Sequence, residues 1–88
     1  KPRRKIESAN YTIQIAAWPS LEQARREQLQ LIEEGFDAYI ERNYRKEKDI
    51  IWYRVRIGKF SDKNKALEVQ KQIESILGVK LWLDVIPL

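Results

Sequence analysis

The fold is decided by residues 50–58, which read Ile-Ile-Trp-Tyr-Arg-Val-Arg-Ile-Gly. Side chains of a β-strand alternate between its two faces. One set is apolar and typical of a core face: Ile51, Tyr53, Val55 and Ile57. The other set places an indole beside two planar, charged donors: Trp52, Arg54 and Arg56. This second set would suit a ligand with ring faces and carboxylates. For a single strand, however, the favoured interpretation is a central strand with a helix-covered Trp flanked by solvated arginines, and the remaining strands decide between the two.

Three further segments show strand alternation, namely residues 11–17, 36–43 and 79–86. Between the strands, two segments have apolar residues at helical spacing. The first is predicted to start at a capping box at Ser20 and to close at Gly35, and the second to start at Ser61 and to close at Gly78. Residues 42–49 are too polar for a core element, so we expect a hairpin loop there.

The two halves of the chain repeat one pattern at an offset of 42 residues, so that Ile15 and Leu31 correspond to Ile57 and Ile73. Each half reads as strand, helix, strand. The sequence therefore predicts an α+β protein with a ferredoxin-like, RNP-like βαββαβ fold, in which two helices cover one face of a four-stranded antiparallel sheet.

The uncovered face of this sheet is expected to gather large aromatic and polar side chains, which is typical of a binding surface. The alternation places there Gln14, Tyr39, Trp52, Arg54, Arg56 and Trp82, together with Thr12 and Ala16. It directs toward the helices Tyr11, Ile13 and Ile15 of the first strand, Phe36, Ala38 and Ile40 of the second, and Val79, Leu81, Leu83 and Val85 of the last.

These residues resemble the SPOR domain, a family found in bacterial division and cell-wall proteins. The similarity runs from Tyr11 to Ile86, and its most specific part is residues 52–60, Trp-Tyr-Arg-Val-Arg-Ile-Gly-Lys-Phe. Residues 11–15 (Tyr-Thr-Ile-Gln-Ile) and 35–39 (Gly-Phe-Asp-Ala-Tyr) add to it. The resemblance implies a βαββαβ module that binds peptidoglycan, prefers glycan strands stripped of their stem peptides, and is thereby drawn to the division septum.

The family's binding residues map onto Gln14, Trp52 and Arg54. Ala17 is included in the predicted site because it stands where the family often has Ser, and Lys59 stands where it often has Pro. For the last strand, counting from Gly78 selects Leu83 as the ligand contact, whereas face alternation selects Trp82. We prefer Trp82 because Leu83 is needed in the core.

An amino-sugar chain offers apolar ring faces, amide groups and, on muramic units freed of peptide, lactyl carboxylates. Trp52 and Tyr39 can stack on the rings, and Gln14 can exchange two hydrogen bonds with an acetamido group. Arg54 and Arg56 can pair a carboxylate in bidentate fashion. A stem peptide would remove that charge and add bulk, so the site would select bare glycan.

Catalysis is not expected, because the chain has no His and no Cys and its serines read as tail, helix-cap or helix-surface residues. No metal or cofactor is expected either. The main alternative function is an RRM-like domain that stacks single-stranded RNA on the same sheet face, although residues 54–60 lack that module's motif. A third possibility is a protein-interaction domain.

The positive charge is concentrated at the start of the chain. Residues 1–7 carry four basic and one acidic side chain, a net +3, whereas the other 81 residues carry 13 basic and 12 acidic side chains, a net +1. We assign residues 1–10 to a basic tail or linker and residues 11–88 to the SPOR-like domain, and we expect no nucleic-acid partner. The domain is expected to be monomeric and to make no membrane contact itself. We expect it to belong to a larger exported or membrane-anchored protein of the bacterial cell envelope. Its expected location is the periplasmic or cell-wall side, at the septum.

Overall fold

The computed structural model describes residues 9–87, which form one sheet and two helices in the order βαββαβ. The elements are β1 (Ala9–Trp18), α1 (Leu21–Glu33), β2 (Ala38–Arg45), β3 (Ile50–Phe60), α2 (Lys63–Leu77) and β4 (Trp82–Pro87). The strands lie in the order β2-β3-β1-β4, and each neighbouring pair is antiparallel. The predicted fold class and topology are confirmed.

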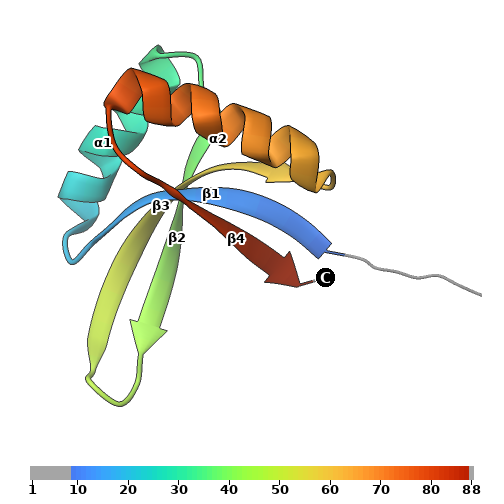
Figure 1. Cartoon of the computed structure of the whole chain (residues 1–88). Coiled ribbons are helices and arrows are strands. Elements are labelled where there is room, and N and C mark those ends of the chain that lie inside the picture. The colour runs from blue at the N-terminus through green and yellow to red at the C-terminus, as the bar shows by residue number, and fades with distance from the viewer. Residues whose placement is uncertain (1–8, 88) are drawn as a thin grey trace, which may run out of the picture.

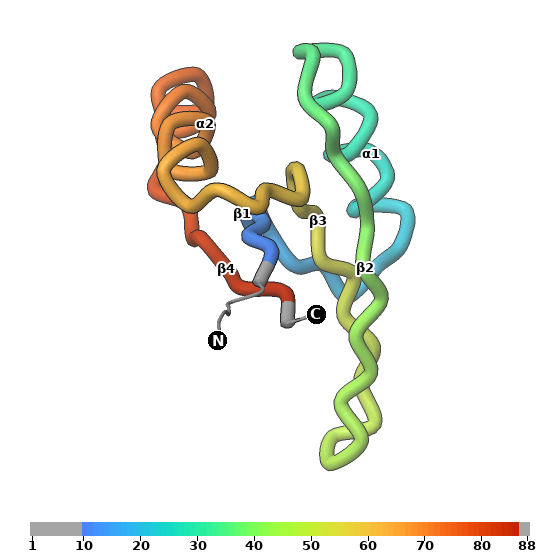
Figure 2. The backbone as a smooth tube through the Cα atoms, turned by 90° about the vertical axis from the view of Figure 1, so that its right-hand side faces the viewer, coloured from blue at the N-terminus to red at the C-terminus, as the bar shows by residue number. Residues whose placement is uncertain are grey.

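Both helices lie on the same side of the sheet (Figure 1). Helix α1 packs against β1, β2 and β3, whereas α2 packs against β1, β3 and β4. The β2–β3 hairpin extends past the helices as an arm (Figure 2). Within residues 9–87, neither helix has the length and apolar character needed to cross a bilayer.

The core lies between the helices and the sheet. Its buried side chains are Ile13, Ala24, Leu31, Ala38, Val55, Ile57, Ile73 and Leu81. Val55 and Ile57 are 0% and 2% exposed, so the predicted core face of β3 is confirmed where the helices cover it. Thr12, which the alternation directs away from this core, is nevertheless 0% exposed.

The two helices begin differently from one another. Helix α1 starts as predicted, because the side chain of Ser20 accepts a hydrogen bond from the backbone N–H of Gln23. The predicted cap of α2 was wrong by one residue: Asp62, not Ser61, accepts a hydrogen bond from the backbone N–H of Asn64 at 2.9 Å. Asp is as good an N-cap as Ser, and its charge also interacts favourably with the helix dipole.

Several strand boundaries differ from the sequence-based expectation. β1 begins at Ala9 rather than Tyr11, and residues 1–8 of the predicted tail lie outside the described residues. β2 continues to Arg45, so the predicted loop 42–49 shrinks to a turn over residues 46–49. Polar residues can form part of a strand there because the hairpin arm is exposed to solvent. β4 begins only at Trp82.

Of the strand residues predicted to face the core, two are exposed. Val79 is 52% exposed because it precedes β4 and is not part of the sheet. Val85 is 51% exposed near the end of β4, an edge strand of the sheet. The prediction that both are buried was wrong.

A bulge interrupts each strand of the central β1–β3 pair. On β3, the partners Phe60 and Ile57 are three residues apart while their β1 partners are only two apart. Gly58 lies in this bulge with a φ of 74°, and a Cβ atom there would clash with the ring of Phe60. The position therefore needs glycine for both its backbone conformation and its space.

The second bulge shifts the alternation of β1. Gln14 lies opposite Arg56, but Ala16 lies opposite Val55, so Ile15 is the extra residue. Ile15 still packs against the core. Beyond it, Ala16 shares a face with buried Val55, and the prediction that Ala16 faces outward was wrong.

Candidate functional site

The face of the sheet away from the helices is built from rows of directly opposite residues. One row crosses all four strands and contains Tyr39, Arg56, Gln14 and Trp82. The next row contains Glu41, Arg54 and Ala17, and two more rows toward the hairpin tip pair Asn43 with Trp52 and Arg45 with Ile50. Cβ atoms of directly opposite residues lie about 5 Å apart. All seven predicted site residues thus lie on one face and in adjacent rows.

An open hollow of about 340 Å³ lies at one end of this face. Its lining residues are Gln14, Ala17, Arg45, Trp52 and Arg54. Four of them belong to the predicted site, and we call this feature the hollow from here on. The structure therefore brings together the three residues to which the family resemblance pointed, together with Ala17.

Arg45 is the lining residue that sequence reasoning missed. Residues 42–49 were assigned to a loop because of their polarity, and a loop residue has no defined face. The alternation begun by Tyr39 continues through Glu41 and Asn43 to Arg45, so extending the strand to the turn would have found it. Arg45 and Glu47 form an ion pair of 3.6 Å, but both side chains are at least half exposed, so solvent screens it.

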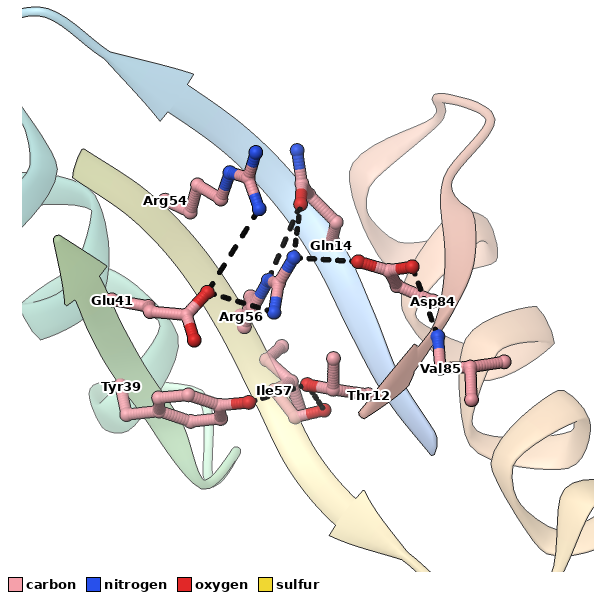
Figure 3. Close-up of polar contacts among 9 residues, drawn as sticks. All are labelled: Thr12, Gln14, Tyr39, Glu41, Arg54, Arg56, Ile57, Asp84 and Val85. Carbon is pink, nitrogen blue, oxygen red and sulfur yellow. Dashed lines mark hydrogen bonds and ion pairs between the residues drawn. The ribbon is translucent and has the colours of Figure 1, made fainter. Parts of the chain in front are cut away.

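Arg56 lies at the centre of a polar network rather than in the hollow (Figure 3). Its side chain is only 5% exposed. Nη1 lies 2.9 Å from a carboxylate oxygen of Glu41, and Nη2 lies 2.6 Å from one of Asp84. Nε and Nη2 both donate to Oε1 of Gln14, at 3.3 Å and 3.1 Å. The positive charge of Arg56 is thus balanced inside the protein.

Arg54 is much less constrained than Arg56. Its closest ionic partner is Glu41, at 3.9 Å from Nη1, and 28% of its side chain is exposed. Glu41 makes its shorter contact with Arg56. Within residues 9–87, the guanidinium N–H groups of Arg54 make no hydrogen bond, and a planar guanidinium of this kind beside an indole is well suited to bind a carboxylate on a ring-shaped ligand.

Tyr39 lies on the same face but outside the hollow. Its hydroxyl donates to Oγ1 of Thr12 at 2.8 Å, and that hydroxyl donates to the carbonyl of Ile57. The ring therefore reaches across β3 to β1 (Figure 3), which explains why Thr12 is buried on a face predicted to be open. The ammonium group of Lys59 lies 5.2 Å from the ring centroid, a cation–π distance.

The two candidates for the last-strand contact lie on opposite faces. Trp82 lies directly opposite Gln14 and is 74% exposed. Leu83 packs against the core. Trp82 does not line the hollow, but it places a second indole on the other side of Gln14 from Arg56. The face therefore offers two flat apolar surfaces with polar groups between them.

The comparison with protein families agrees with the fold. The model of the SPOR domain family matches residues 7–83, which is nearly the whole chain. No curated protein and no solved structure matches the chain significantly. SPOR domains are known as peptidoglycan-binding domains of bacterial cell-envelope proteins. Because the family model matches nearly the whole chain and the fold is βαββαβ, the chain belongs to the SPOR domain family.

Proposed function

We propose that this chain is a non-catalytic module that binds peptidoglycan glycan strands lacking stem peptides, and that it brings the protein of which it is part to the division septum. The observation that carries the proposal is the hollow, where Gln14, Trp52 and Arg54 line one surface beside Ala17 and Arg45. These residues come from β1, β2 and β3 and form a continuous surface on the open face.

The chemistry of the hollow matches that of a bare glycan. The indole of Trp52 can stack on the apolar face of a sugar ring. Arg54 can bind the lactyl carboxylate of a muramic unit through two parallel hydrogen bonds, and Arg45 adds a second cation in the same hollow. Trp82 can stack on a ring further along the strand.

Selectivity against intact peptidoglycan follows from the same contacts. A stem peptide is attached through an amide on the lactyl carboxylate, so it removes the negative charge that Arg54 would bind. It also adds bulk at the hollow. A septal location would then follow wherever peptides are removed from the glycan during division.

The proposal is tested by changing Arg54 to Lys and to Gln. Lys keeps the charge but loses the planar fork, so Arg54→Lys should bind amidase-treated sacculi at least about fivefold more weakly, and Arg54→Gln more weakly still. The matched control is Arg42→Lys, because Arg42 lies opposite Tyr53 on the other face of the hairpin. It should bind as the wild type does.

The same three proteins are compared with wild type on untreated sacculi and on single-stranded RNA at two salt concentrations. We expect weak binding to untreated sacculi and to RNA. A phosphate-binding surface would behave differently, because Lys would replace Arg54 almost fully and affinity would fall steeply with salt. Tight, salt-sensitive RNA binding with no binding to stripped sacculi would overturn the proposal.

A further inference from the structure

The contact between Gln14 and Arg56 fixes which end of the Gln14 amide faces the protein. A guanidinium has only N–H donors, so the amide atom that faces it must be the carbonyl oxygen. Oε1 accepts two hydrogen bonds from Arg56, which use both of its lone pairs. The amide nitrogen points away from Arg56 (Figure 3).

Arg56 cannot easily turn to release this amide. Its guanidinium is held from both sides, by Glu41 on β2 and by Asp84 on β4, at 2.9 Å and 2.6 Å. The Arg56 side chain is only 5% exposed, whereas its carboxylate partners Glu41 and Asp84 are about half exposed, so solvent reaches the carboxylates more readily than the guanidinium. Residues from β2, β3 and β4 therefore hold Gln14 of β1 in one orientation through a single guanidinium.

We infer that Arg56 is a positioning residue that makes Gln14 a hydrogen-bond donor, so that every polar side-chain group lining the hollow is a donor. The inference rests on the proposed function of the hollow. Arg45 and Arg54 have no acceptor atoms, and the indole of Trp52 offers only its N–H. The ligand group in the hollow must then supply acceptor oxygens, as a free carboxylate does, because a hydroxyl or amide N–H directed there would find no acceptor among these side chains.

A purely structural Arg56 would give a different outcome. In that case the network would stabilise the sheet, the amide of Gln14 would serve the ligand as donor and acceptor alike, and Arg56 variants would change stability alone. The two roles can be separated because the polarity of Gln14 can be altered without removing the acceptor that Arg56 uses.

Gln14→Glu makes this change. The carboxylate keeps an oxygen for Arg56 and replaces the outward NH₂ group with a second oxygen. We expect an unchanged or higher urea midpoint and at least about tenfold weaker binding to amidase-treated sacculi. Gln72→Glu is the control, because it makes the same charge change at an exposed position of α2. Its binding should match that of the wild type.

A double-mutant cycle tests Arg56 itself. Arg56→Lys should weaken binding in the wild-type background and have no further effect in a Gln14→Ala background, because it acts through Gln14. Binding is measured below each variant's unfolding transition. Asp84→Asn, which loosens the guanidinium from β4, is carried through the same cycle in case Arg56→Lys does not fold.

The outcomes separate this inference from the proposed function. Absence of wild-type binding to stripped sacculi would remove the proposed function and the inference with it. Wild-type binding that Gln14→Glu leaves unchanged, or additive losses in the cycle, would overturn the positioning role of Arg56 while leaving the proposed function in place.

Discussion

Ala17 and Arg54 lie directly opposite each other on β1 and β3, and both line the hollow. The pairing depends on Ile15, the extra residue that shifts the alternation of β1 between Gln14 and Ala16. The bulge turns the methyl group of Ala17 toward the hollow. Whatever side chain occupies position 17 therefore contributes directly to the chemistry of the site.

The first prediction is that Ala17→Ser tightens binding to amidase-treated sacculi by roughly threefold to tenfold, because it adds a hydroxyl beside Arg54. Ala16→Ser is the matched control. Ala16 lies opposite buried Val55, so its hydroxyl would be directed to the core side and should lower the urea midpoint without improving binding. Tighter binding by Ala16→Ser alone would show that the register is wrong.

The second prediction concerns the stacking surface. Trp52→Ala should remain folded and bind stripped sacculi about tenfold or more weakly, because the indole lines the hollow rather than the core. Trp18→Ala provides the contrast: Trp18 packs against the core, and its indole N–H donates to Glu27 at 2.8 Å. That variant should lose stability in urea. Unfolding of Trp52→Ala would contradict its assignment to the open face.

The third prediction tests the core. Ile57 is 2% exposed on the helix-covered face of β3, so Ile57→Ala should lower the free energy of unfolding by about 2 to 4 kcal/mol. Urea denaturation followed by circular dichroism measures the change. The folded fraction should still bind glycan, because Ile57 does not line the hollow. Unchanged stability would be inconsistent with the packing described above.

The fourth prediction is a dependence of stability on pH. Glu74 on α2 accepts a hydrogen bond from the backbone N–H of Leu81 at 2.8 Å, and this contact lowers the pKa of its carboxyl. The charged form is therefore favoured in the folded state. Its stabilising contribution is present at neutral pH and is lost as the pH falls through the lowered pKa.

Glu74→Gln should accordingly lower the urea midpoint at about pH 7 and have a smaller effect at a pH below the lowered pKa, where the wild-type carboxyl is also protonated. Glu68→Gln, at an exposed position of the same helix, is the control. An equal loss at both pH values would mean that Glu74 contributes through shape alone and not through its charge.

The predictability of the fold and the site varied along the chain for physical reasons. Residues 50–57 obey strict alternation, so both faces of β3 could be assigned from sequence, including Trp52 and Arg54. The faces of β1 were predicted wrongly beyond Ile15, because a bulge shifts the alternation there. The small and aliphatic residues around Ile15 contain no sequence pattern that indicates a bulge. Arg45 was missed because strand propensity assigns its polar segment to a loop. In the structure, pairing with β3 extends β2 through this segment to Arg45.

Other departures came from contacts between distant segments. Thr12 is buried by Tyr39, which lies 27 positions later in the chain, and Arg56 is enclosed by carboxylates from two other strands. The sequence identified both Tyr39 and Arg56 as residues of the open face. It could not show that their polar groups are already bonded within the protein, since that depends on the order of the strands.

The pairing of Ala9 with Pro87 determines where segments joined to the domain would attach to the sheet. The first residue of β1 and the last of β4 are cross-strand partners, so the chain enters and leaves at one corner of the sheet (Figure 2). Ala17 lies eight positions further along β1, roughly 25 Å away in an extended strand. Spacers or fluorescent reporters joined before β1 or after β4 would therefore attach to the sheet at a corner remote from the hollow, and neither fusion should obstruct access of a ligand to the hollow.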